Sequence, residues 1–284
     1  MRKQVDELLS LMRERDIDLY IVPSEDFHQS EYVGEYFKAR AYVSGFTGSA
    51  GTLVATADEV CLWTDGRYFL QGEAQLKGSG IRLMKMGEPK VPTVKEYIED
   101  KLPVGGTLGF DGRTISVADG ADYEAICEKK SASITYNMDL VGEIWPNRPA
   151  LSNKPAFKLD ESITGESAAS KLSRIREAMK QKGADTHIVA SLDDVCWTLN
   201  LRGDDIKYSP ILLCYGLITM DEMVLFIDEN KLSDDIKAEL KELNVRLRPY
   251  NSIYDDVKAL SGKTILLDPT KMNYALYESI PGDN

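Results

Sequence analysis

Apolar residues recur at helical spacing near the start of each half of the chain. The positions are Val5, Leu8, Leu9 and Met12 in the first half and Leu172, Ile175 and Met179 in the second. A spacing of three and four residues predicts an amphipathic helix in both places. A short apolar run follows each helix, at residues 19–22 and 187–190. Runs of this kind are typical of strands buried in a layered sheet.

A second shared pattern consists of two β-rich runs that an acidic turn separates. Residues 52–56 and 60–64 flank Ala57-Asp58-Glu59, and residues 211–219 and 223–227 repeat the arrangement. Both pairs predict a hairpin whose turn stays in water. Further short strands, which we expect to alternate with helices, lie at residues 82–85, 107–110, 245–248 and 264–267. This alternation indicates α/β layers around a mixed sheet in each half.

The two halves also share residues at fixed offsets, which indicates an internal duplication. The segment from Met12 to Asp26 returns from Met179 to Asp193, and the Thr-x-Asp-Glu turn at Thr56 returns at Thr219. A cluster of prolines between Trp145 and Pro155 disfavours helix and marks a linker. We therefore predict two domains, at residues 1–146 and 161–284, joined by a linker at residues 147–160.

Composition and charge narrow the classes of function. The formal net charge of -12 argues against a nucleic-acid partner, whose phosphates require clustered Lys and Arg. No stretch approaches the roughly 20 apolar residues that span a bilayer, so no membrane partner is expected. The N-terminus lacks the apolar core of a signal peptide, which makes the cytoplasm the expected location. The four cysteines (Cys61, Cys127, Cys196 and Cys214) lie in apolar contexts that suit buried free thiols.

Residues that carry hydrolytic chemistry are scarce. The only histidines are His28 and His187, and His187 lies in a strand-like run where a structural role is expected. No metal-binding, nucleophile-elbow or phosphate-binding motif is present. Asp193-Asp194 and Asp204-Asp205 are adjacent pairs, and neighbouring residues on a strand point to opposite faces. We expect Asp193 to cap the helix that follows it rather than to bind a metal.

Three loops in the first half combine polar, aromatic and glycine residues. They are residues 23–32, 44–51 and 63–69. Arg67 follows a strand and a glycine turn, so its guanidinium can project from the end of the sheet toward a carboxylate or a carbonyl of a ligand. The alternative is a structural salt bridge between Arg67 and Asp65.

These three loops resemble the N-terminal domain of long-form Xaa-Pro aminopeptidases. The matching motifs are Pro23-Ser-x-Asp-x-His28-x-Ser-Glu-Tyr32, Val43-Ser-Gly-Phe-x-Gly-Ser-Ala-Gly51 and Trp63-Thr-Asp-Gly-Arg-Tyr-Phe-Leu-Gln71. Leu192 to Asp204 with Pro210 is similar to the second domain of that family, and Ile144-Trp-x-x-Arg-Pro149 is similar to its linker. The resemblance implies two tandem creatinase N-terminal-like domains, each a three-layer α/β/α unit with a mixed sheet.

The resemblance also implies a third, catalytic pita-bread domain that this chain does not contain. In that family two aspartates, a histidine and two glutamates hold two divalent cations, commonly manganese, and none of these ligand motifs matches a position here. We therefore expect no catalytic residue, no metal ligand and no cofactor in this chain. The implied partners are peptides with proline at the second position, the catalytic domain of the same protein and a second copy in a homodimer. The implied role is gating of substrate and oligomer contacts.

Residue by residue, the resemblance implies that Arg67 reaches toward the substrate and that Asp65 orients it. Phe46 and Trp63 are expected to help form the wall that limits the site to short peptides. His28 matches the family motif and is included among the substrate-site residues, with a loop-fixing hydrogen bond as its expected contribution. The alternative function is a peptide- or protein-binding module of a catalytically dead homologue.

Overall fold

The computed structural model describes residues 2–284, which form two compact units. Unit 1 contains residues 2–26 and 35–150, and unit 2 contains residues 27–34 and 151–284. The short segment 27–34 therefore leaves the first part of the chain and packs within unit 2.

Unit 1 is built on a six-stranded mixed sheet with the order β4-β3-β2-β1-β5-β6. The strands are β1 (Leu19–Val22), β2 (Thr52–Thr56), β3 (Val60–Thr64), β4 (Ile81–Lys85), β5 (Thr107–Phe110) and β6 (Ser133–Thr135). Strand β2 is antiparallel to β1 and β3, and every other neighbouring pair is parallel. The alternating side chains of the central strands face two helical layers, because successive residues of a strand point to opposite faces.

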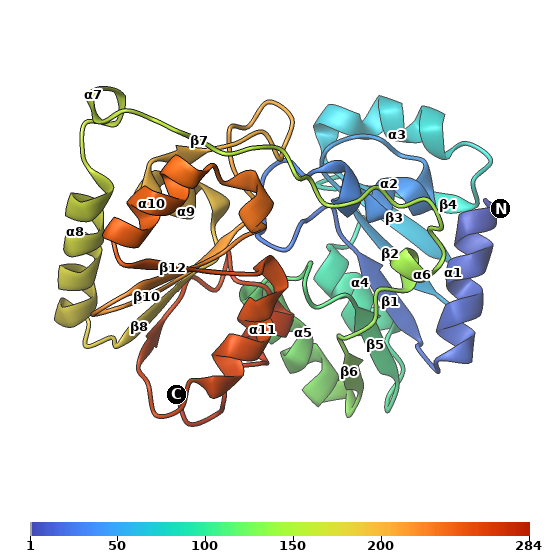
Figure 1. Cartoon of the computed structure of the whole chain (residues 1–284). Coiled ribbons are helices and arrows are strands. Elements are labelled where there is room, and N and C mark those ends of the chain that lie inside the picture. The colour runs from blue at the N-terminus through green and yellow to red at the C-terminus, as the bar shows by residue number, and fades with distance from the viewer. Residues whose placement is uncertain (1) are drawn as a thin grey trace. The chain divides into compact units, whose positions relative to one another are not determined.

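Helices cover both faces of this sheet (Figure 1). One layer consists of α1 (Lys3–Glu14), α2 (Ala39–Ser44), α3 (Phe69–Leu76) and α6 (Leu140–Glu143), and the other of α4 (Val94–Lys101) and α5 (Val117–Lys130). Val5 and Leu8 of α1 pack in the core with Leu53 and Leu62 of the sheet. On the opposite face Trp63 lies edge-on to Tyr97 of α4, with ring centroids 4.9 Å apart.

Unit 2 repeats this plan on a five-stranded sheet with the order β12-β11-β10-β8-β13. Its strands are β8 (Thr186–Val189), β10 (Tyr215–Thr219), β11 (Met223–Phe226), β12 (Val245–Arg248) and β13 (Ile265–Leu266). Its helices are α7 (Glu161–Thr164), α8 (Ala168–Gln181), α9 (Leu192–Leu199), α10 (Asp234–Glu242), α11 (Ile253–Asp256) and α12 (Tyr274–Tyr277). A ribbon of β7 (Phe157–Lys158) and β9 (Leu201–Arg202) completes the unit.

The predicted duplication is confirmed by topology and by local geometry. Strands β8, β10, β11, β12 and β13 follow one another in the same order and directions as β1 to β5. In unit 1 the amide of Glu59 donates to Thr56 Oγ1 at 3.1 Å, and in unit 2 the amide of Glu222 donates to Thr219 Oγ1 at 3.1 Å. The Thr side chain therefore closes the same hairpin turn in both units.

Two expectations of local structure are wrong. Strand β10 begins at Tyr215 rather than at residue 211, because residues 211–214 complete a loop instead of pairing in the sheet. The cap of α9 is Ser191, whose side chain accepts from the amide of Asp194, so Asp193 is not the capping residue. Asp193 lies in the first turn of α9, where a negative charge is favourable at the helix N-terminus.

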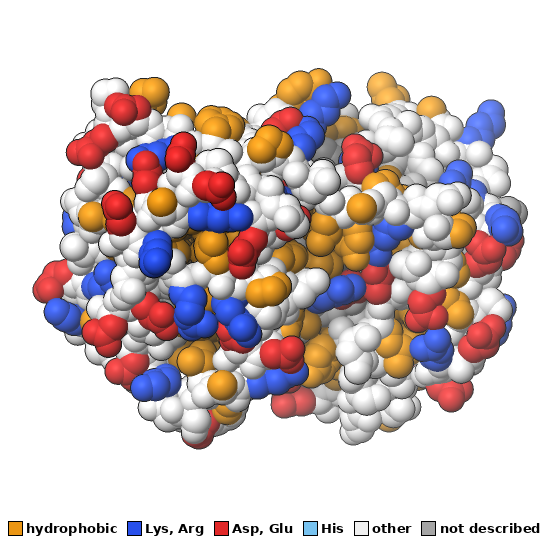
Figure 2. Space-filling model, viewed as in Figure 1, with side chains coloured by type: hydrophobic (Ala, Val, Ile, Leu, Met, Phe, Trp, Pro, Cys, Tyr) orange, Lys and Arg blue, Asp and Glu red, His pale blue; other side chains and the backbone are white. Residues whose placement is uncertain are grey.

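The surface is charged but mixed. On the face that Figure 2 shows, acidic and basic side chains are interspersed. Among residues 2–284, no helix is both long enough and apolar enough to cross a membrane. All four cysteines are buried, as their apolar contexts predicted.

Candidate functional site

One edge of the unit 1 sheet collects two of the loops that the sequence singled out, residues 44–51 and 63–69, together with residues 23–26 of the third. The parallel strands β1, β3 and β5 end at this edge, and β2 begins there because it runs in the opposite direction. The loop after β1, the glycine-rich loop before β2 and the loop after β3 therefore meet. In open α/β sheets the carboxyl ends of parallel strands are the usual place for a ligand site.

The buried guanidinium of Arg40 ties the first two loops together. Arg40 is 4% exposed, and its Nε and Nη2 donate to Ser24 Oγ at 2.9 and 2.8 Å. Its Nη1 and Nη2 also donate to the carbonyls of Phe46 and Gly48. Burial lowers the pKa of Arg40 to about 10, which still leaves the group charged at neutral pH. One side chain thus donates hydrogen bonds to the Ser24 hydroxyl and to two backbone carbonyls that belong to no strand.

The glycine-rich loop is held against β3 by close backbone approach. Thr64 Oγ1 donates to the carbonyl of Ala50 at 2.7 Å, and Ser24 Oγ donates to the carbonyl of Gly51 at 2.6 Å. A Cβ atom at Gly51 would lie 2.7 Å from the carbonyl oxygen of Trp63. Only glycine allows this approach, which explains the glycine at this position.

Phe46 and Trp63 lie beneath the loops rather than on the surface. Phe46 is 0% exposed and Trp63 is 1% exposed. Phe46 lies edge-on to Tyr68, and Trp63 Nε1 donates to the carbonyl of Pro92 at 2.8 Å. These two residues fix the positions of the loops, and they do so from inside the fold.

Arg67 and Asp65 form an ion pair with two parallel hydrogen bonds at the end of β3, which we call the fork of Arg67. Asp65 caps the short 3-10 turn Gly66–Tyr68, and its Oδ1 accepts from the backbone amide of Arg67. Arg67 Nε and Nη2 donate to Asp65 Oδ1 and Oδ2 at 2.8 and 2.9 Å. The structural salt bridge considered for this pair is therefore present, and 67% of the Arg67 side chain remains exposed. The hydrogen bonds from Arg67 lower the pKa of Asp65 to about 2.

A second fork of the same kind stands at the end of β5, and the sequence reasoning missed it. The tripeptide Asp111-Gly112-Arg113 repeats Asp65-Gly66-Arg67. Arg113 Nε and Nη2 donate to Asp111 Oδ1 and Oδ2 at 2.9 and 2.8 Å. Burial opposes the charge of Arg113, but its hydrogen bonds and ion pairs with Asp111 and Asp139 raise its pKa. The repeated tripeptide was the signal that would have revealed this fork.

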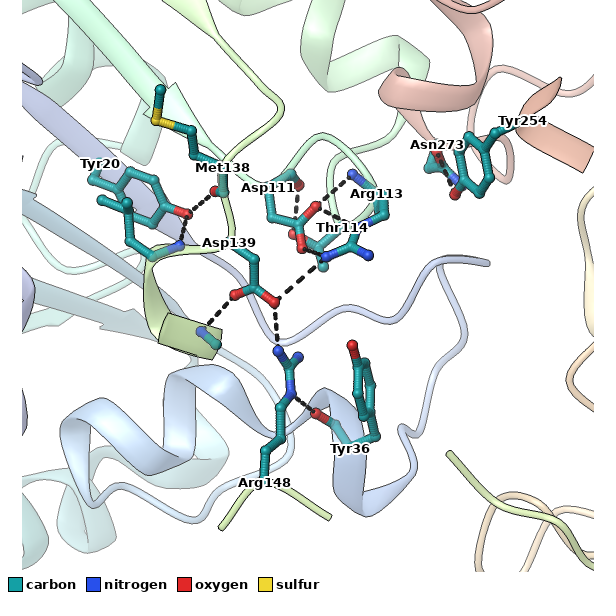
Figure 3. A network of polar contacts seen from close by, with 12 residues as sticks. Tyr20, Tyr36, Asp111, Arg113, Thr114, Met138, Asp139, Arg148, Tyr254 and Asn273 are labelled. Carbon is teal, nitrogen blue, oxygen red and sulfur yellow. Dashed lines mark hydrogen bonds and ion pairs between the residues drawn. The ribbon is translucent and has the colours of Figure 1, made fainter. Parts of the chain in front are cut away.

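The second fork differs from the first because it belongs to a closed polar network (Figure 3). Asp139 accepts from Arg113 at 3.4 Å, pairs with Arg148 and caps α6 by accepting from the amide of Gly142. Arg148 lies over the ring of Tyr36 at 3.9 Å. The network borders a cavity of about 20 Å³, which is room for about one water molecule. This fork therefore stabilises the loops, whereas the fork of Arg67 is open to solvent.

His28 belongs to the segment 27–34, which is part of unit 2 rather than of unit 1. His28 is 1% exposed, with Nδ1 2.7 Å from the carbonyl oxygen of Ala190 and Nε2 2.7 Å from the hydroxyl of Tyr250. The carbonyl can only accept, so Nδ1 carries the proton and the Tyr250 hydroxyl donates to Nε2 in the neutral ring. The adjacent carbonyl of Phe27 accepts from Asn273 at 2.8 Å. His28 thus anchors the segment 27–34 within unit 2.

The equivalent turn of unit 2 has no arginine fork. Asp228 occupies the position after β11 that Asp65 occupies after β3, but Asn230 stands in place of an arginine. Asp228 Oδ1 accepts from the amide and the side-chain nitrogen of Asn230 at 3.0 and 2.9 Å. The capped turn is kept, whereas the exposed positive charge is found only at the fork of unit 1.

The chemistry that this site can perform is recognition. An exposed, pre-oriented guanidinium binds carboxylate or carbonyl oxygens through two parallel hydrogen bonds. Within residues 2–284, no three or more His, Cys, Asp or Glu side chains converge as a metal site would require. His187, the other histidine, has Nδ1 2.9 Å from the carbonyl oxygen of Leu266 and acts as a structural residue of β8.

Comparison with known families accounts for both units. The model of the creatinase/prolidase N-terminal domain family matches residues 4–141, and a second model with the same description matches residues 147–284. The two matches together cover nearly the whole chain.

Individual relatives are similar along the full length of the chain. Aminopeptidase P2 of Arabidopsis thaliana is 41% identical over 283 residues, which is 96% of this chain and 40% of the relative. Xaa-Pro aminopeptidase 1 of Dictyostelium discoideum is 36% identical and covers 99% of this chain and 46% of the relative. The chain thus spans less than half the length of these curated relatives.

A solved structure agrees with both the sequence match and the fold. The X-prolyl aminopeptidase of Caenorhabditis elegans, described as a cytosolic enzyme with a di-nuclear active site, is 33% identical with a TM-score of 0.93. The match covers 99% of this chain and 49% of that one.

Replacement of Arg40 tests whether its buried guanidinium holds the loops. Arg40→Lys keeps the charge but cannot reach Ser24, Phe46 and Gly48 at once, so buried carbonyls lose their donors. We expect the free energy of unfolding to fall by about 3 kcal/mol and amide exchange at residues 46–50 to accelerate. Arg15→Lys, at a half-exposed ion pair with Glu143, is the control and should change stability by less than about 0.5 kcal/mol. Equal effects of the two substitutions would contradict the role of Arg40.

The pKa of the Asp65 carboxyl group shows whether its ion pair with Arg67 persists in solution. Because the folded pKa is lowered, the fork contributes fully above the unfolded value of about 3.9 and is lost as the pH falls toward about 2. We expect the carboxyl carbon of Asp65 to titrate in NMR with a midpoint near 2. In Arg67→Ala the midpoint should return to about 4. A midpoint near that ordinary value in the unaltered chain would show that the fork does not persist in solution.

Proposed function

The chain belongs to the family of creatinase/prolidase N-terminal domains, and on this premise we propose that it is the non-catalytic N-terminal region of an Xaa-Pro aminopeptidase. Such a hydrolase removes an N-terminal residue that precedes proline. We assign domain I to residues 1–146, the linker to residues 147–160 and domain II to residues 161–284. The observation that carries the proposal is the solvent-open fork of Arg67, held at the edge of the sheet where the loops meet.

Arg67 is proposed to contact the peptide substrate. Its guanidinium is anchored on one side by both oxygens of Asp65, so Asp65 sets its direction. The Arg67 guanidinium carbon also lies 5.3 Å from the centroid of the Tyr68 ring, which further limits its motion. An arginine whose orientation is fixed before binding loses less conformational entropy when it binds a carbonyl or carboxylate.

Phe46, Trp63 and His28 are proposed to support substrate binding indirectly. All three are almost completely buried, so they hold the loops and the segment 27–34 in place. The proposed gating role depends on this rigidity, because loops that are fixed in place would admit only short or unstructured peptides to the substrate site. We also propose that this region contributes contacts between the two subunits of a homodimer of the parent protein.

The hydrolytic chemistry is proposed to reside in a catalytic domain outside this chain. Two divalent cations, with manganese as the proposed metal, would activate the attacking water there. The di-nuclear active site described for the Caenorhabditis elegans relative supports this part of the proposal. The cytosolic location described for that relative supports a cytoplasmic location for the parent protein.

A second candidate function is peptide binding without cleavage. The fork of Arg67 suits a carboxylate or carbonyl ligand whether or not a bond is later broken. The parent would then be a catalytically dead homologue that binds peptides or protein partners. The presence or absence of the five metal ligands in the rest of the parent protein distinguishes the two functions.

The chain on its own is expected to be inactive. Incubation of residues 1–284 with an Arg-Pro-Pro peptide and added Mn²⁺ should leave the peptide uncut, as followed by mass spectrometry. The full-length parent under the same conditions is the positive control. Cleavage by the isolated chain above a blank would place the chemistry within it and overturn the proposal.

Loss of Arg67 is expected to impair the full-length enzyme. Arg67→Ala removes a charge-assisted contact of about 1.5 to 3 kcal/mol, so kcat/KM for Xaa-Pro peptides should fall by about 10- to 150-fold. Arg67→Lys keeps the charge without the two-point geometry and should give an intermediate loss. Arg15→Ala, at an exposed ion pair, serves as the surface control. An unchanged kcat/KM in Arg67→Ala would refute substrate contact by this residue.

A further inference from the structure

The ring of Tyr68 lies against both the fork of Arg67 and the glycine-rich loop of unit 1. The guanidinium carbon of Arg67 is 5.3 Å from the centroid of the Tyr68 ring. On the side of the loop, the Tyr68 ring lies edge-on to Phe46, with ring centroids 5.9 Å apart. A Cβ atom at Gly48 would lie 2.9 Å from a carbon of the Tyr68 ring, so only glycine lets the ring approach the loop this closely. Tyr68 therefore belongs to the same site as Arg67.

The hydroxyl of Tyr68 is paired with the hydroxyl of Ser49 in the glycine-rich loop. The two oxygens lie 2.7 Å apart, and either of them can be the donor. Each hydroxyl has one proton and can also accept a hydrogen bond. Because one proton lies between the two oxygens, the other proton can be donated to a third group. Ser49 is exposed and Tyr68 is half-buried, so a ligand in solvent can reach this pair.

The glycine-rich loop is also tied to α3, the helix that follows the turn of Arg67. The amide of Thr47 donates to Gln75 Oε1 at 2.9 Å, and Gln75 Nε2 donates to Thr47 Oγ1 at 2.9 Å. These two hydrogen bonds limit the motion of the loop relative to the helix. The spacing between the Ser49–Tyr68 pair and the Arg67 guanidinium is thus set before a ligand arrives, which lowers the entropy that binding costs.

The charge of the site indicates which peptide group it binds. Asp65 already neutralises Arg67, and the two hydroxyls contribute hydrogen-bond donors rather than charge. A carboxylate ligand would be repelled by Asp65 and would compete with it for the same cation. A main-chain carbonyl oxygen is neutral and accepts from both guanidinium and hydroxyl donors. A proline residue has no amide proton to donate but keeps its carbonyl, so a site made of donors suits a proline-containing peptide.

We propose that the Ser49–Tyr68 hydroxyl pair is a second donor of the Arg67 site, and that the pair and the guanidinium bind two main-chain carbonyl oxygens of one peptide substrate. Hydrogen bonds to main-chain carbonyls do not depend on the side chains of the peptide. This contact therefore selects an accessible main chain and tolerates variation in its sequence. The inference rests on the proposed function, because it concerns the substrate that the same site binds.

The test removes both hydroxyls from the full-length parent. In Ser49→Ala/Tyr68→Phe the aromatic ring stays against Phe46 and Gly48, so the thermal unfolding midpoint should change little. We expect kcat/KM for Arg-Pro-Pro to fall by about three- to tenfold, mainly through KM, because a hydrogen bond to a neutral acceptor is lost. The same loss is expected for Arg-Pro-Pro amide, which has no C-terminal carboxylate.

The matched control is Ser133→Ala. Ser133 Oγ lies 3.4 Å from Thr107 Oγ1, so these two residues form another exposed hydroxyl pair of unit 1. Thr107 and Ser133 begin β5 and β6, whereas the loops of the Arg67 site meet at the opposite edge of the sheet, where β5 ends. The control variant should therefore keep the activity of the unaltered parent toward both peptides.

Four results of this comparison would overturn the inference. One is an unchanged kcat/KM in Ser49→Ala/Tyr68→Phe, and another is an equal loss in Ser133→Ala. A loss accompanied by a lower unfolding midpoint would assign the hydroxyl pair to a structural contact. A loss confined to the free-acid peptide would show that the pair recognises the C-terminal carboxylate instead of main-chain carbonyls.

A binding measurement separates this inference from the proposed function. The probe is an Arg-Pro-Pro amide analogue whose scissile amide is reduced to an amine, and its dissociation constant for the full-length protein is measured by calorimetry. The constant should rise by about three- to tenfold in Ser49→Ala/Tyr68→Phe. If the parent does not cleave Xaa-Pro peptides but this weakening occurs, the aminopeptidase proposal fails and the inference stands. Equal dissociation constants, or no binding to the unaltered protein, overturn the inference whether or not the parent cleaves such peptides.

Discussion

The arrangement of the unit 1 site depends on one buried cation. Arg40 lies inside the fold and donates to a serine hydroxyl and to two backbone carbonyls of the glycine-rich loop. Those carbonyls belong to no strand, so without Arg40 they would be buried without donors, which is costly. The loops after β1 and before β2 therefore keep one conformation. That conformation in turn fixes the surface beside which the fork of Arg67 stands.

The duplicated fold has been used differently in its two units. Both keep the strand order and the Thr-closed hairpin, since these maintain the sheet. After β3 the capped turn presents an arginine to solvent, whereas after β11 it presents an asparagine. Unit 2 instead has a buried pair of Asp205 and Lys231, which supports a projecting loop. The two units thus share one fold but differ in which loops carry their charged side chains.

Much of the fold followed from the pattern of residues. The amphipathic helices and the hairpins were predicted from spacing, because burial against a sheet imposes those periods on the sequence, and the duplication was predicted from residues that the two halves share at fixed offsets. The family followed from three loop motifs, and the structure brings two of those loops together with the turn that carries Arg67. Strand β6 and the ribbon of β7 and β9 were missed because such short strands have little periodicity of their own. The cap at Ser191 was missed because two polar residues compete for the start of the same helix.

The sequence by itself determined which elements form, how they repeat and to which family the chain belongs, since these depend on local periodicity and on motifs within single loops. Only the tertiary structure decided where individual polar side chains act. Arg40 became a buried clamp through contacts with Ser24 and Gly48, and Arg113 became part of a closed network through Asp139, which lies 26 residues further along the chain. His28 entered unit 2 although its motif lies in the first half. Burial and pairing of this kind arise from long-range contacts, which a pattern of neighbouring residues does not specify.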